Sequence, residues 1–124
     1  MTNRFEDVIA WQKARVFINH VYRETKGFPA EERYGLVSQF QRAAVSIAAN
    51  IAEGYKRAGK DDKMRFFNYS QGSLEECRCY IYLAHDFNYI TNDTENQMIA
   101  EIEETSKVLN GYMNSMSNRR KWED

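Results

Sequence analysis

The sequence has few of the residues that interrupt regular structure. One proline and six glycines in 124 residues argue against disorder and against an all-β chain, which needs many turns. No apolar run approaches the ~18 residues of a membrane span. The net charge of −1 leaves no overall basic field to attract nucleic acid. The N-terminal residues lack the charged-then-apolar order of a signal peptide, so we expect a cytoplasmic protein.

Cysteine is also scarce, with only Cys77 and Cys79 present. On a helix these two side chains point roughly 200° apart, which excludes a disulfide or a shared metal ion. We therefore expect two reduced thiols, with Cys77 as a small core residue.

The residues that enzymes use for catalysis are sparse. Neither His20 nor His85 follows a glutamate by three residues, so the di-iron bundle motif is missing. Neither has a second histidine or cysteine at metal-ligand spacing, and both are expected at the surface or its boundary. Gly54 and Gly59 flank a segment that does not match a phosphate-binding loop. We predict no enzyme activity, no catalytic, cofactor-binding or metal residues, and no small-molecule substrate.

Helical periodicity dominates the rest of the chain. The apolar spacing predicts four helices, at about residues 8–25, 36–57, 61–87 and 93–117. Short connections make consecutive helices antiparallel neighbours, which predicts an all-α, up-down-up-down four-helix bundle. We expect one domain over residues 1–118 and a flexible tail over residues 119–124.

Particular residues predict where the helices end. Gly59 offers a left-handed turn after the second helix, and Asn88 can terminate the third. Thr94 with Gln97 matches a capping box for the fourth. Gly72 lies inside the third helix at a cost of about 1 kcal/mol against alanine, which close approach of a neighbouring backbone would explain.

The second helix carries an unusual polar stripe. Spacings of 3, 4, 4, 3 and 4 place its members within a sector of roughly 80°. Apolar residues and alanines lie beside it, so the helix is expected to pack on more than one side. We interpret the stripe as a polar network at a helix–helix or subunit interface. Its members are Gln39, Arg42, Ser46, Asn50, Glu53 and Arg57.

The charges are polarised along the predicted bundle. The turn between the second and third helices holds five basic residues against two aspartates: Lys56, Arg57, Lys60, Lys63 and Arg65. The tail adds Arg119, Arg120 and Lys121 at the same end, whereas the acidic start of the fourth helix lies at the opposite end. Two interpretations stay open: a solvated loop and tail, or a phosphate-binding rim that a ring of subunits would repeat.

At these residues the chain resembles the four-helix-bundle proteins named for open reading frames in intervening sequences of bacterial 23S rRNA genes. The matching pieces are FEDVIAWQKA (5–14), Phe28-Pro29, Glu32, Tyr34-Gly35-Leu36, Gln39, RAAVSIAANIAEG (42–54), Arg57 and GSLEE (72–76). The chain departs from the family pattern in having Gln41 for a basic residue, Ala48 for proline, and Gly59-Lys60 where serine or threonine is common.

The resemblance implies an antiparallel four-helix bundle that forms a homopentameric ring without enzyme activity. Accessory proteins of diversity-generating retroelements, a related group, form pentamers that bind nucleic acid and a reverse transcriptase. Those proteins are markedly basic and this chain is not. The sequence therefore predicts a non-enzymatic homo-oligomeric scaffold or adaptor. The alternative is an RNA- or DNA-binding accessory protein that uses the basic turn.

Overall fold

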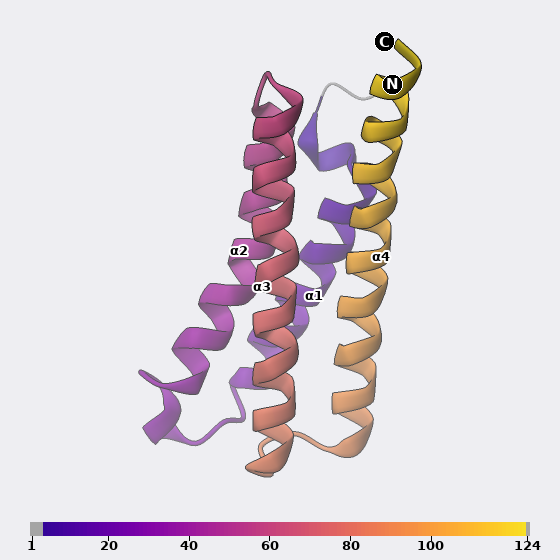
Figure 1. The fold of residues 1–124 in the computed structure, drawn as a ribbon. Coiled ribbons are helices and arrows are strands. Elements are labelled where there is room, and N and C mark those ends of the chain that lie inside the picture. Colours follow the sequence, from indigo (N-terminus) through magenta and orange to yellow (C-terminus); the bar gives the residue numbers. More distant parts are fainter. Residues whose placement is uncertain (1–3, 124) are drawn as a thin grey trace.

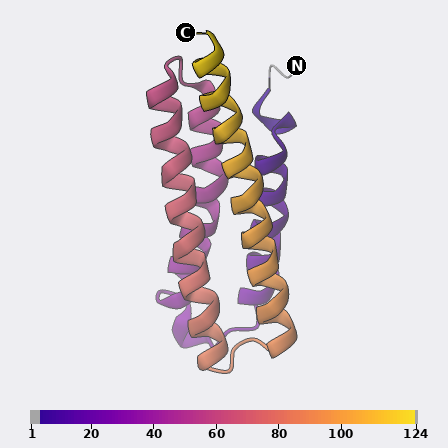
Figure 2. The ribbon, with the colours of Figure 1, turned by 45° about the vertical axis from the view of Figure 1, so that its right-hand side comes forward.

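A computed structural model describes the backbone of residues 4–123 and the side chains of residues 4–116. Four helices make up the fold: α1 (Ile9–Thr25), α2 (Leu36–Lys56), α3 (Lys60–Asp86) and α4 (Asn92–Glu123). Short 3-10 helices, η1 (Phe5–Asp7) and η2 (Ala30–Glu32), precede α1 and α2, and residues 4–123 contain no strand. Consecutive helices run in opposite directions, so the start of α1 and the end of α4 lie at the same end of the bundle (Figure 1). The turned view shows the same four-helix arrangement (Figure 2). The predicted fold class is confirmed.

The ends of α1, α2 and α3 lie within one residue of the ranges expected from the periodicity. The backbone of α4 is helical to Glu123, beyond the expected end at residue 117. The tail expected over 119–124 falls on residues whose side chains lie outside the described part of the chain.

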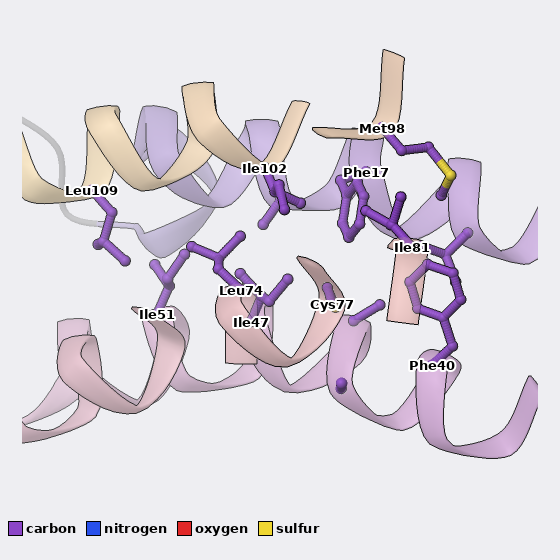
Figure 3. Packing of buried hydrophobic residues seen from close by; sticks show 14 of the residues in the cluster. Phe17, Phe40, Ile47, Ile51, Leu74, Cys77, Ile81, Met98, Ile102 and Leu109 are labelled. Carbon is purple, nitrogen blue, oxygen red and sulfur yellow. The ribbon is translucent and has the colours of Figure 1, made fainter. Parts of the chain in front are cut away.

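The core fills the space between all four helices (Figure 3). Each helix contributes residues three or four apart, so one apolar face of each helix points inward. The largest fully buried side chains are Phe17, Phe40, Phe67, Ile47, Ile51, Leu74, Ile81, Met98, Ile102, Leu109, Val21 and Thr105. Cys77 is buried among them and Cys79 is exposed, and both are free thiols as expected.

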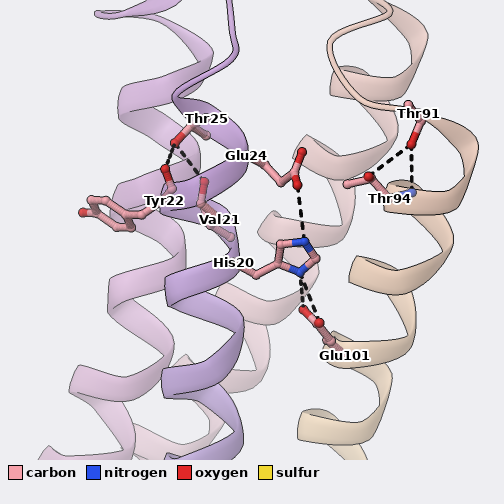
Figure 4. A network of polar contacts seen from close by, with 8 residues as sticks. All are labelled: His20, Val21, Tyr22, Glu24, Thr25, Thr91, Thr94 and Glu101. Carbon is pink, nitrogen blue, oxygen red and sulfur yellow. Dashed lines mark hydrogen bonds and ion pairs between the residues drawn. The ribbon is translucent and has the colours of Figure 1, made fainter.

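Two of the predicted helix ends differ in detail. Asn88 follows α3 with a left-handed φ of 64°, in agreement with its predicted role as terminator. The prediction for Gly59 is wrong, because its φ of −88° is not left-handed. The predicted cap of α4 is also wrong. Thr91, and not Thr94, caps this helix, since Oγ1 of Thr91 accepts the backbone N–H of Thr94 at 3.1 Å (Figure 4).

Of two glycines inside helices, Gly54 is tightly packed and Gly72 faces open space. A Cβ added at Gly54 would lie 2.6 Å from the ring of Phe67 and 3.2 Å from the carbonyl oxygen of Lys63. Gly54 therefore allows α2 and α3 to approach closely. A Cβ at Gly72 would meet nothing within 4 Å. The close approach predicted at Gly72 is therefore wrong within this chain.

Candidate interaction surfaces

The central part of the polar stripe lies against α3. Ser73 Oγ of α3 donates to Ser46 Oγ at 2.9 Å, and Asn50 Nδ2 donates to the same hydroxyl at 2.9 Å. Ser70 Oγ, fully buried, donates to the carbonyl oxygen of Ile47 at 2.6 Å. These bonds satisfy polar groups that would otherwise be costly to bury. We call this line of contacts the α2–α3 seam.

Charged members of the stripe continue the seam toward both ends of α2. Arg42 pairs with Glu76 of α3 at 2.8 Å and also donates to Gln39 at 3.3 Å. Glu53 pairs with Arg57 one helical turn later at 2.9 Å. These side chains are 39% to 54% exposed, so each pair contributes little to stability. The structure thus places the whole stripe within the α2–α3 seam or at its edge.

The basic turn beyond the seam is largely engaged within the chain. Asp62 pairs with Arg65 at 2.7 Å and with Arg57 at 3.7 Å. Both guanidinium groups lie over the ring of Phe66, at 4.5 Å for Arg57 and 4.9 Å for Arg65. Cation–π contacts of this kind hold the two arginines on one aromatic platform.

Lys63 of α3 caps the C-terminal end of α2. Its Nζ donates to the carbonyl oxygens of Tyr55 at 2.6 Å and Gly54 at 3.3 Å, which satisfies free carbonyls of the last turn. Burial lowers the pKa of Lys63. Lys56 and Lys60 form no ion pair within residues 4–116, so they are the members of the basic turn left for an external anion. The side chains of Arg119, Arg120 and Lys121 lie outside the described residues.

His20 is a buried residue that the sequence analysis placed incorrectly at the surface or its boundary. It is 4% exposed, with Nδ1 at 2.9 Å from Oε1 of Glu101 and Nε2 at 3.6 Å from Oε2 of Glu24 (Figure 4). Its place three residues after Phe17, on the apolar face of α1, is a signal that could have identified it. His85 is half-buried, hydrogen-bonded to Asn92 and 3.5 Å from Glu95.

An apolar groove of about 670 Å³ lies between α1 and α4. Its walls include Ile9 and Val16, which are 53% and 60% exposed, and Ala100. Lys13 of α1 and Glu104 of α4 pair across it at 3.7 Å, and both side chains are substantially exposed. Sequence periodicity does not reveal this α1–α4 groove, because the groove depends on how two helices distant in sequence are spaced.

A second exposed surface, made of uncharged side chains, lies on α2, on the side away from the core. We call it the α2 outer face, and it consists of Ser38, Val45, Ala49 and Ala52. Val45 is 44% exposed, Ser38 and Ala49 are exposed, and Ala52 is half-buried. These side chains are uncharged, whereas Arg42, 54% exposed, lies between Ser38 and Val45 on the same side of the helix, so the small apolar part of the face runs from Val45 to Ala52.

No group of three or more potential ligands that could hold a metal ion occurs among the described residues. None of the described helices is long and apolar enough to cross a membrane.

Comparison with known proteins identifies the family. The family of 23S rRNA-intervening sequence proteins matches residues 6–111. The chain belongs to this family. Comparison with curated protein sequences gives no match.

A solved structure has the same architecture as this 23S rRNA-intervening sequence protein. A protein with unknown function from the S23 ribosomal protein family of Bacteroides thetaiotaomicron superposes with a TM-score of 0.75 at 20% identity. The superposition covers 84% of this chain and 97% of that one. At this identity the likeness shows the fold alone. The range matched by the family includes the α2–α3 seam, the α2 outer face and both walls of the α1–α4 groove.

Proposed function

We propose that this chain is a non-enzymatic, homo-oligomeric scaffold or adaptor of the cytoplasm, assembled as a ring of five identical subunits. The observation that carries the proposal is the α2 outer face. Small, uncharged side chains cover it, yet they have no role in the core of the described chain. Such a surface suits close packing against a second copy.

Two exposed glycines support close contact between copies. Gly72 on α3 and Gly111 on α4 lie inside helices, and a Cβ at either would meet nothing within 4 Å. Each costs its helix about 1 kcal/mol relative to alanine, with no compensating contact inside the chain. A neighbouring subunit packed closely over these positions would supply the compensation.

The position of these features allows a ring. The α2 outer face and the two glycines lie on different helices, so a contact that joins them uses two different patches. Such heterologous contacts generate closed rings when the rotation between neighbours closes. The number five rests on the resemblance to pentameric relatives.

Light scattering of the purified chain at micromolar concentration tests the proposal. We expect a mass that is a multiple of the 14.6-kDa protomer, and five times that mass for the ring. Val45→Lys places a charge on the α2 outer face and should shift the mass toward the protomer. Val16→Lys, the same substitution at an exposed valine of α1, should leave the mass unchanged. A stable monomer in the wild type, or an unchanged mass in Val45→Lys, would overturn the proposal.

The alternative function is binding of RNA or DNA at the basic turn. Lys56 and Lys60 are the available cations, and Arg57 and Arg65 stacked on Phe66 form a polar and aromatic surface beside them. Phosphate contacts predict affinity that falls steeply as salt rises. A mobility-shift assay with structured RNA at low salt tests this, with the double variant Lys56→Glu/Lys60→Glu as the loss-of-function control. No shift in the wild type would remove the alternative.

A further inference from the structure

The α1–α4 groove is a second unpartnered surface, separate from the α2 outer face. Its wall residues Ile9 and Val16 are more than half exposed although they are large aliphatic side chains. Leaving such side chains in water forgoes the stabilisation that burial of apolar surface provides. Ile9, Val16 and Ala100 line one side-open groove, which makes it a candidate interaction site.

The groove has the length and shape to bind a helix. A smaller hollow of about 310 Å³, lined by Val8, Val108 and Tyr112, adjoins it and shares Ile9. The two together extend along α4 from Gln97 to Tyr112, about 22 Å at 1.5 Å per residue. A helix of about 15 residues matches that length. The groove is open along its side, which suits a helix better than an enclosed small molecule.

The charges around the groove favour a helix with basic side chains. Carboxylates predominate on its rim, where Glu101 and Glu104 of α4 outnumber Lys13 of α1. Glu101 is held by His20, whereas Glu104 is 52% exposed and, among the side chains of residues 4–116, pairs with Lys13 alone, at 3.7 Å. An exposed pair of this length is weak enough to be exchanged for a contact with an incoming cation.

We propose that the α1–α4 groove binds a basic amphipathic helix of a partner protein. The apolar side of that helix covers Ile9, Val16 and Ala100, and its lysine or arginine side chains reach Glu101 and Glu104. The inference deepens the adaptor role proposed above and rests on it: one surface joins copies of the chain and a different surface holds the partner.

Fluorescence anisotropy with two synthetic peptides tests the groove. Both are labelled helices of about 15 residues with the same leucine seam, one flanked by lysines and the other by glutamates. The lysine peptide should bind saturably to the full chain, roughly tenfold more tightly than the glutamate peptide, and less tightly as salt rises. Val16→Lys should weaken binding of the lysine peptide roughly tenfold, whereas Val45→Lys should leave it unchanged.

The same two variants separate this inference from the proposed assembly. Val45→Lys should alter only the mass in light scattering, and Val16→Lys only the anisotropy. Equal affinity for the two peptides, no saturable binding, or equal loss in both variants would overturn the groove as a site for a basic helix. A lower mass in Val16→Lys would show that a second copy occupies the groove, and would overturn the partner helix instead. An unchanged mass in Val45→Lys contradicts the proposed interface without affecting the peptide result.

Discussion

Replacing Gly54 by alanine tests the close approach of α2 and α3. A Cβ at this position would lie 2.6 Å and 2.9 Å from two ring carbons of Phe67, which is fully buried. The ring is confined by the core, and the carbonyl oxygen of Lys63 at 3.2 Å is backbone. Overpacking of this kind costs about 1–3 kcal/mol. Alanine returns about 1 kcal/mol through its higher helix propensity. The net expectation is a loss of up to about 2 kcal/mol.

Urea unfolding followed by circular dichroism, at one protein concentration throughout, measures this change. The double variant Gly54→Ala/Phe67→Leu provides the internal check, because leucine removes the ring carbons that the new methyl group meets. Residues in contact typically show coupling energies of 0.5–3 kcal/mol, and we expect about 1 kcal/mol or more in favour of the double variant. A Gly54→Ala protein stabilised by the full helix-propensity gain of about 1 kcal/mol would refute the spacing of α2 and α3 described above.

Three further predictions concern buried or hydrogen-bonded groups. Glu101→Ala removes the carboxylate that contacts buried His20 and should lower the free energy of unfolding by about 1–3 kcal/mol. Glu104→Ala removes one side of an exposed ion pair and should change the free energy of unfolding by less than about 1 kcal/mol. Equal effects of the two substitutions would contradict the buried contact. Hydrogen bonds from the Leu36 amide and the Tyr89 hydroxyl lower the pKa of Glu32 below its ordinary value. The charged Glu32 carboxylate therefore stabilises the folded state above the ordinary pKa, and this stabilisation is lost as the pH falls through the lower pKa of the folded state. Melting temperatures measured from neutral to acid pH should therefore fall less steeply in Glu32→Gln, and parallel curves would argue against the contact. Burial raises the pKa of Cys77 to about 12, so a thiol reagent should modify Cys79 in the native protein and Cys77 only after unfolding, which mass spectrometry can count.

The fold could be predicted because each helix carries its own signal. Apolar residues at positions such as Phe40, Ala44, Ile47 and Ile51 recur with helical spacing, and short connections leave few arrangements for the four helices. The polar stripe was also visible in the sequence, because its side chains share one face of a single helix. Its partners on α3, such as Ser73 and Glu76, could not be assigned, because the facing of two helices depends on their packing.

The features that sequence reasoning missed depend on the spacing between elements. Gly54 and Gly72 both lie inside helices, yet one meets a buried ring and the other faces open space. The burial of His20 depends on Glu101, 81 positions away in the chain. Ile9 and Val16 likewise line a groove whose existence depends on the spacing of α1 and α4. Local periodicity carries no information about these distances.

Native mass spectrometry of the wild-type chain and of Val45→Lys tests the central claim most directly. Under the proposed assembly through the α2 outer face, the wild type should appear as a discrete multiple of the 14.6-kDa protomer, with five copies for the proposed ring. The lysine of Val45→Lys should disrupt the proposed contact between copies, so this variant should appear mainly as the protomer. The protomer should stay folded, because a change at one exposed side chain alters its stability by only about 0.5 kcal/mol. A wild-type chain found only as a protomer, or a variant that keeps the wild-type copy number, would contradict the account.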